Sequence, residues 1–274
     1  MLRFAVAGAP LSTPGPGGSL KGLVRAHELG INAMELEWVQ SVPVNPERMK
    51  EIRELAKKLD ITLTVHAPYY VNLNSPDRVK LLASIKRVTD ALSMAEIAGA
   101  RSVCVHAAFN LGQEPDVVYK NVSKAVEMIM EKKPKLFPNV NLALETMGKQ
   151  TQFGTLEESL KISKEFGNYP CVDPAHLHAR SNGLVNSTEE WNDMLDQYEK
   201  VLGGKALKNV HFHFSGIAYT AKGERHHLPL KESDAKWEDF LKVLKDRKVE
   251  GTVVCESPAM EEDTLLMKNT FEDL

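Results

Sequence analysis

Eight short apolar stretches with β-strand character recur along the chain, and several of them end in a histidine, an aspartate or a glutamate. Between them, apolar residues recur at helical spacing. The expected strands are Leu2–Ala7, Ala33–Trp38, Thr62–His66, Ser102–His106, Asn141–Glu145, Tyr169–Asp173, Asn209–Phe214 and Thr252–Glu256. Eight parallel strands that alternate with helices close into a barrel whose strands end on one common face. The pattern predicts an α/β fold, a (β/α)8 TIM barrel, with residues 1–274 as a single domain.

The segments between the expected strands carry helix start and stop signals. Helices are expected over Pro46–Lys58, Pro76–Ala98, Lys236–Lys245 and Glu262–Glu272, and capping-box spacing marks two further helix starts at Thr155 and Ser187. An open doubly wound sheet is the competing architecture. It would need a glycine-rich phosphate turn after the first strand, and GAPLSTPGPGG does not fit G-x-G-x-x-G. The pattern therefore favours the barrel.

Charge and hydropathy restrict the partners of the chain. No apolar run is long enough to span a membrane, and the N-terminus lacks the features of a signal peptide, so we expect a cytoplasmic protein. The formal net charge is -3, which gives none of the basic footprint of duplex binders. Bound divalent metals would weaken this objection to a DNA substrate, because they add positive charge beside a phosphate.

The chain has three cysteines, Cys104, Cys171 and Cys255, and none has C-x-x-C spacing. Each lies inside an expected strand, close to a candidate metal ligand. Free cysteines are commonly small buried residues of a protein core. We interpret all of them in this way, with zinc ligation as the lesser alternative.

Histidine and carboxylate side chains gather near the ends of the expected strands. The candidate metal ligands are His66, His106, Glu145, Asp173, His176, His211, His213, Glu224, His226, His227 and Glu256. Several such groups facing one cavity would be costly to bury unpaired, and metal coordination is the natural compensation. Mixed histidine and carboxylate ligation suits Zn²⁺ or Mn²⁺. The sequence therefore predicts a multi-metal site at the C-terminal ends of the strands.

Two pairs of histidines leave the ligand set open. His211 and His213 point to the same side of their strand, and His213 is favoured because it is nearer the C-terminal end. Glu224 follows in a polar, glycine-bearing loop, where His226 and His227 compete to join it. Spacing alone does not decide between these two.

These residues carry a resemblance to a known family that runs over almost the whole chain. The most specific stretches are His66-Ala-Pro-Tyr69 with Asn72-Leu73, Glu145-Thr-Met-Gly148 with Gly154-Thr-Leu-Glu157-Glu158, Asp173-Pro-Ala-His176 and Glu224-Arg-His226. The chain resembles the endonuclease IV family of abasic-site endonucleases, within the xylose-isomerase-like barrel superfamily. The resemblance implies a metal-dependent hydrolase that cuts DNA on the 5′ side of an abasic nucleotide in base excision repair.

The resemblance also implies a site with up to three zinc ions. On that pattern the ligands would be His66, His106 and Glu145 for the first zinc, Glu145, Asp173, the seventh-strand histidine and Glu256 for the second, and His176, Glu224 and His226 for the third. Zinc lowers the pKa of water and polarises a phosphate. Glu145, which would bridge two ions, and Glu256 are the expected catalytic residues.

The expected partner is DNA with abasic sites, bound by a monomer that presents an open face. Tyr69 would lie beside the site, Asn72 belongs to the same motif, and Arg225 is a candidate contact to phosphate. Two features depart from the family. Glu224 stands where aspartate is usual, and HFHFSG replaces His-Leu-Asn-Asp around the seventh strand. The chain is therefore expected to be a divergent branch.

The strongest rival is a sugar isomerase or epimerase on the same barrel. Such an enzyme would use Glu145, Asp173, a seventh-strand histidine and Glu256 for one metal, with the two glutamates moving a proton on the substrate. His106 and the Glu224 motif favour the nuclease, because one metal has no use for them. A non-catalytic binding protein would leave the full ligand set unexplained. Glu35 and Glu37 share a strand face and are either supporting residues of the site or simply salt-bridged.

Overall fold

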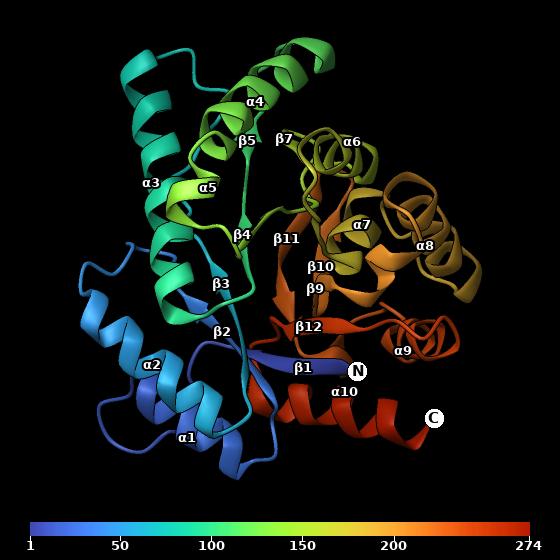
Figure 1. Cartoon of the computed structure of the whole chain (residues 1–274). Coiled ribbons are helices and arrows are strands. Elements are labelled where there is room, and N and C mark those ends of the chain that lie inside the picture. Colours follow the sequence, from blue (N-terminus) through green and yellow to red (C-terminus); the bar gives the residue numbers. More distant parts are fainter.

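The computed structural model describes all 274 residues and contains a barrel of parallel strands wrapped by helices (Figure 1). The sheet has eight strands in the order β6-β4-β3-β2-β1-β12-β9-β8. The strands are β1 (Leu2–Ala7), β2 (Ala33–Glu37), β3 (Thr62–His66), β4 (Ser102–Val105), β6 (Asn141–Leu144), β8 (Cys171–Val172), β9 (Val210–Phe214) and β12 (Gly251–Cys255). A parallel bridge between Glu145 and Cys171 joins the two outer strands. The predicted (β/α)8 TIM barrel is confirmed.

Helices cover the outside of the sheet. They are α1 (Ser19–Glu28), α2 (Pro46–Lys58), α3 (Arg78–Ala98), α4 (Pro115–Met130), α5 (Lys133–Leu136), α6 (Leu156–Phe166), α7 (Pro174–Arg180), α8 (Thr188–Leu202), α9 (Trp237–Asp246) and α10 (Glu261–Asp273). The helix starts predicted at Thr155 and Ser187 are confirmed, and each forms a capping box. Both boxes satisfy backbone N–H groups that have no partner within the first helical turn. None of these helices is long and apolar enough to cross a membrane.

The large apolar core lies between the sheet and the helices, whereas the barrel interior is lined by small and polar side chains. The outward-facing Leu36, Val65 and Leu142 belong to one core cluster of 39 buried residues. Inside the barrel, Ala5 and Ala143 leave room for Glu35 and His213, both of which are fully buried. TIM barrels usually fill this space with branched apolar residues. The buried polar side chains inside the barrel therefore lie below the histidines and carboxylates at the strand ends.

Two small antiparallel pairs lie beyond the barrel strands. One is β5 (Ala108–Phe109) with β7 (Gln152–Phe153), and the other is the hairpin of β10 (Gly216–Thr220) and β11 (Gly223–Leu228). The expectation of a loop around Glu224 is therefore wrong, because this residue lies on β11. His176 lies in the first turn of α7, which Asp173 caps by accepting from the His176 N–H at 2.9 Å.

Candidate metal centre

The centre of the site is a group of four side chains at the ends of four barrel strands. Glu145, Asp173, His213 and Glu256 each offer one ligand atom, and these atoms all lie within 4.8 Å of one another. The Nδ1 atom of His213 lies 3.2 Å from Glu256 Oε2 and 3.5 Å from Glu145 Oε1. The first three residues are completely buried. The expected convergence of strand ends therefore occurs for this set.

His66 and His106 lie beside the central group, next to the Oε2 atom of Glu145. The Nε2 atom of His106 lies 2.8 Å from Glu145 Oε2, and that of His66 lies 3.7 Å from it. The ring of Tyr69 packs against both imidazoles, with centroid distances of 5.1 Å to His66 and 5.2 Å to His106. Glu145 therefore has one oxygen on each side of the site, as a bridging carboxylate requires.

A third group consists of His176, Glu224 and His227, whose ligand atoms also lie within 4.8 Å of one another. The Nε2 atom of His176 lies 3.6 Å from Glu224 Oε2 and 3.4 Å from His227 Nε2. His226, which the family pattern implied, is exposed and does not join this group. His226 lines the same cavity as His227, but only His227 belongs to this donor group.

His227 rather than His226 joins this donor group because the pairing of the β10–β11 hairpin is irregular. Ala218 pairs with His226 and Tyr219 with Glu224, so Arg225 is an extra residue on β11. Such a bulge reverses the alternation of side chains along the strand. Glu224 and His227 consequently face the same side.

His211 lies deeper in the barrel than the central group. Its Nδ1 atom contacts Ser102 Oγ at 3.0 Å, and its Nε2 atom contacts Glu35 Oε2 at 2.9 Å. The second oxygen of Glu35 lies 3.0 Å from His213 Nε2. The seventh-strand residue of the central group is therefore His213, while His211 and Glu35 support it from below.

Three histidines are held with one ring nitrogen free. The Nδ1 atoms of His66, His176 and His227 contact the backbone oxygens of Ala67, Thr146 and Glu256 at 2.8, 2.9 and 3.0 Å. A carbonyl can only accept, so each Nδ1 carries a proton, and in the neutral ring each Nε2 would present its lone pair. Metal-binding histidines are commonly oriented in this way.

Buried atoms without partners provide the second sign that the residues fit metal ions. Glu145 Oε1, Asp173 Oδ2 and His213 Nδ1 are buried in the central group and have no hydrogen-bond partner. Native proteins rarely leave such atoms unsatisfied. Nitrogen and carboxylate donors of this kind suit zinc. The residues present therefore fit the metals that the resemblance implies.

In the metal-free protein, protonated histidines balance the negative charges of the buried carboxylates. Burial alone would lower the pKa of His66, but the nearby carboxylate of Glu145 and the charge of Glu37 raise it to about 10. Burial also opposes the charged form of Glu145, yet the pKa of Glu145 is held well below its usual value by His106 and His213. Bound cations would take over this role from the protonated imidazoles.

The three groups open into a cavity of about 260 Å³ whose wall includes Tyr69, Lys149 and Gln152. Sequence reasoning missed Lys149, although it directly follows the Glu145-Thr-Met-Gly148 motif. Of the expected substrate-binding residues, Tyr69 lines the cavity and Arg225 is exposed on the hairpin.

The third of these, Asn72, has a structural contact. Its Oδ1 atom accepts from the backbone N–H groups of Asn74 at 3.1 Å and Phe109 at 3.4 Å. This side chain therefore fastens the loop after β3 to β5.

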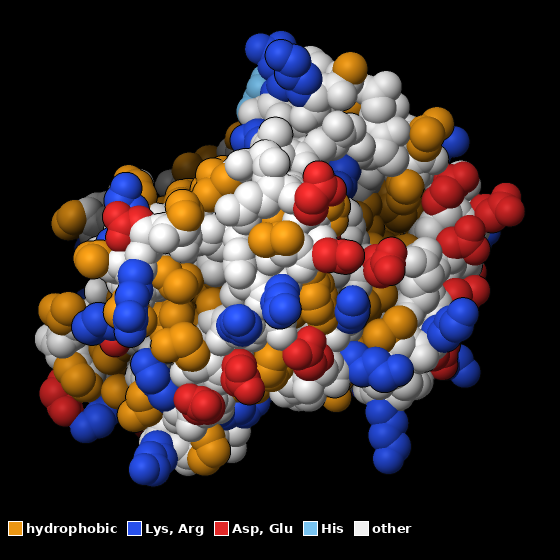
Figure 2. All heavy atoms as spheres, turned by 90° about the horizontal axis from the view of Figure 1, so that it is seen from above, with side chains coloured by type: hydrophobic (Ala, Val, Ile, Leu, Met, Phe, Trp, Pro, Cys, Tyr) orange, Lys and Arg blue, Asp and Glu red, His pale blue; other side chains and the backbone are white.

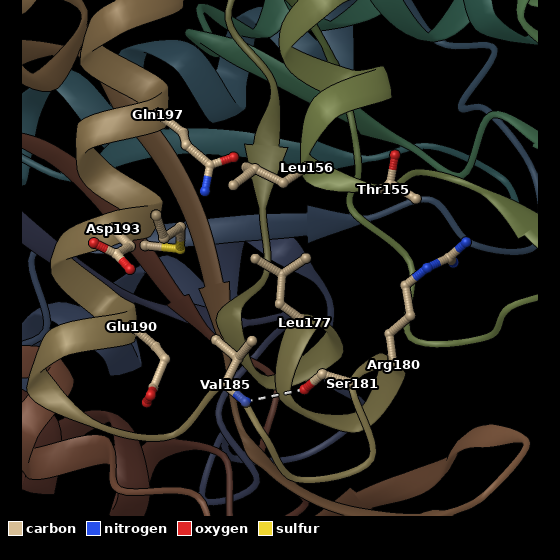
Figure 3. Close-up of a pocket in the computed structure, with 10 residues that line it drawn as sticks. Thr155, Leu156, Leu177, Arg180, Ser181, Val185, Glu190, Asp193 and Gln197 are labelled. Carbon is tan, nitrogen blue, oxygen red and sulfur yellow. Dashed lines mark hydrogen bonds between the residues drawn. The ribbon is translucent and has the colours of Figure 1, made fainter.

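A second hollow, of about 380 Å³, lies on the outer wall between α6, α7 and α8 (Figure 3). Leu156, Leu177 and Val185 face it, and Arg180 lies at its edge. The Arg180 guanidinium donates to the backbone oxygens of Lys149 and Gln152 at 2.7 and 3.2 Å. It therefore fixes the segment that walls the metal-site cavity, but the hollow itself holds none of the candidate ligands.

Fold and site together define a (β/α)8 barrel with groups of potential metal ligands at the C-terminal ends of its strands. The chain belongs to the xylose isomerase-like TIM barrel family, whose profile matches residues 23–272.

Among its relatives, an uncharacterized protein of Methanocaldococcus jannaschii is 37% identical over 274 residues, which cover 100% of this chain and 98% of that one. A probable endonuclease 4 of Aquifex aeolicus is 25% identical over 252 residues and covers 89% and 88% of the two chains.

Solved structures show the same fold with different names. Endonuclease IV from Thermus thermophilus superposes with a TM-score of 0.74 at 20% identity, over 99% of this chain and 100% of that one. A D-tagatose 3-epimerase-like protein also gives 0.74, at 18% identity and over 99% and 96% of the two chains. The fold alone therefore does not choose between nuclease and epimerase.

Proposed function

We propose that this protein is a metal-dependent phosphodiesterase that hydrolyses DNA on the 5′ side of abasic sites. The supporting observation is that the third group, His176, Glu224 and His227, adjoins the central group in one cavity. Single-metal sugar chemistry has no role for these donors or for His106. A site for several ions suits phosphodiester hydrolysis, in which both the attacking and the leaving oxygen must be stabilised.

The metal ligands would be the residues of the family pattern. His213 and His227 would occupy the two positions at which the sequence left a choice between two histidines. Zinc bound there would act as a Lewis acid on the phosphate and lower the pKa of water. Glu145 would bridge, because its Oε2 atom faces His106 and its Oε1 atom faces His213. Mn²⁺ is the alternative metal for the same donors.

Other residues of the cavity wall would handle the substrate. Lys149 lines the cavity and would pair with a phosphate oxygen. Tyr69 is 48% exposed beside the first metal position and would contact the nucleotide displaced from the duplex. The enzyme is proposed to act as a cytoplasmic monomer, as expected from the sequence.

Surface charge gives little help to DNA binding. On the face shown in Figure 2, lysine and arginine side chains are interspersed with aspartate and glutamate. The net charge of the chain is -3. Phosphate binding would therefore depend on the metals and Lys149 more than on a broad basic surface.

A sugar epimerase remains the second candidate, because the central group of Glu145, Asp173, His213 and Glu256 is a complete ligand set for one metal. Glu145 and Glu256 would then exchange a proton with the substrate carbon. This function would leave the third group without a role.

The first experiment is the nicking of a synthetic duplex that carries one abasic site. A 5′ nick that chelator abolishes and Glu145→Gln eliminates is the expected result, with His27→Ala, an exposed histidine of α1, as the control that retains activity. A metal-loaded protein that leaves the duplex intact would contradict the nuclease. Ketose epimerisation assayed on the same preparation then tests the second candidate.

A further inference from the structure

Cys104 lies directly against the carboxylate that joins the two halves of the site. Its thiol donates to Glu145 Oε2 at 3.0 Å, the same oxygen that His106 Nε2 approaches at 2.8 Å. The cysteine is completely buried inside the barrel. Cys104 is a buried core residue, as the sequence indicated, and its thiol also contacts a candidate metal ligand.

Donor geometry supports a direct role. The ligand atoms of His66, Cys104 and Glu145 lie within 4.8 Å of one another. Cys104 and His106 are two residues apart on the same chain segment, so their side chains point to the same side. A cation between His66, Cys104 and Glu145 Oε2 would contact all three donors.

We propose that Cys104 is a thiolate ligand of the ion held by His66, His106 and Glu145. Binding would exchange the thiol proton for a metal–sulfur bond and release that proton to solvent. The inference rests on the proposed metal centre but not on the proposed reaction.

The ligand count has a chemical consequence. With Cys104 added to His66, His106 and Glu145, the ion would have four protein donors, the number that is typical of a structural zinc site. Water activation would then fall to the other two positions. Thiolate ligation also favours zinc or cadmium over manganese at this position.

Cobalt substitution tests the inference, because a thiolate bound to Co²⁺ gives a charge-transfer band in the near ultraviolet. Metal-free protein would be titrated with Co²⁺, alongside Cys104→Ser, Cys171→Ser and Cys255→Ser. Cys255 is buried on another face, in the core cluster with Met267, and serves as the matched control. The Cys104→Ser hydroxyl can still donate to Glu145, and circular dichroism would verify its fold.

The expected result is a band in the parent protein and in the Cys171 and Cys255 variants, but none in Cys104→Ser. Zinc affinity of Cys104→Ser should also fall by at least about 10-fold. Cobalt bound with visible bands but no charge-transfer band would overturn the inference and leave the metal centre intact.

Two further outcomes would also overturn it. Loss of the band in Cys171→Ser as well would place the ion deeper, between both cysteines and His213, whose ligand atoms also lie within 4.8 Å of one another. Failure to take up cobalt would overturn the metal centre itself. Absence of nicking with the expected band present would reject only the proposed reaction.

Discussion

Glu224 and His227 face the same side of β11 although they are three residues apart. A regular strand would place them on opposite faces, because side chains alternate with a period of two. The bulge at Arg225 removes this alternation and brings both toward His176, whose Nε2 atom is 3.4 Å from that of His227. The hairpin thereby adds a third donor group to the four residues at the strand ends.

The first prediction concerns this choice of histidine. His227→Ala should lose one zinc ion per chain and lower nicking by more than about 100-fold, a larger effect than the removal of a residue that only supports a ligand. His226→Ala, one residue away, exposed and outside the donor group, should retain the full metal content. Elemental analysis of purified protein measures the zinc. Equal losses in the two variants would argue that the bulge does not select the ligand.

The second prediction concerns the space that Gly148 leaves for Glu224. A Cβ atom at position 148 would lie 2.6 Å from Glu224 Cβ and 3.2 Å from His176 Cδ2. Gly148→Ala should therefore displace Glu224 and weaken the third metal position, with a loss of about 1–3 kcal/mol in unfolding free energy.

Gly17→Ala is the control for this prediction, because a Cβ there meets nothing within 4 Å. Urea unfolding and zinc titration measure the two effects. Unchanged zinc stoichiometry in Gly148→Ala would show that the hairpin yields without moving its ligands.

The third prediction concerns Glu35, which lies 3.0 Å from His213 Nε2 and 2.9 Å from His211 Nε2. A carboxylate behind a ligating histidine orients the ring and increases its basicity. Glu35→Gln should weaken metal binding at the central group by about 10–100-fold. Isothermal titration with zinc measures the change, and an affinity equal to that of the parent protein would assign Glu35 a packing role only.

The barrel strands could be predicted because each is a short apolar run between helical patterns. Leu2–Ala7 and Thr62–His66 have the same bounds in the structure as expected from sequence, and the other strands differ by at most two residues at either end. The donors at their ends follow from the geometry of parallel strands.

The hairpin could not be predicted in the same way. Its β11 sequence, GERHHL, is polar, and it becomes a strand by pairing with β10. A register shift at Arg225 depends on this pairing and has no local signal. Likewise, the proximity of Cys104 to Glu145 joins residues 41 positions apart, and only the closed barrel brings them together.

The last prediction concerns the pH dependence of stability with and without metal. The pKa of His66 is raised from 6.5 to about 10, so its contribution to stability is complete below pH 6.5 and is lost as the pH rises toward 10. The pKa of Glu145 is lowered from 4.5, so its contribution is present above pH 4.5 and is lost below it. Metal-free protein should therefore be most stable between pH 4.5 and pH 6.5.

Zinc binds neutral imidazole, so its stabilising effect should grow as the pH rises above 6.5. Urea unfolding across this range, with chelator or with zinc, measures both trends. A chelated protein whose stability stays constant from pH 6.5 to 10 would contradict the pairing of His66 with Glu145.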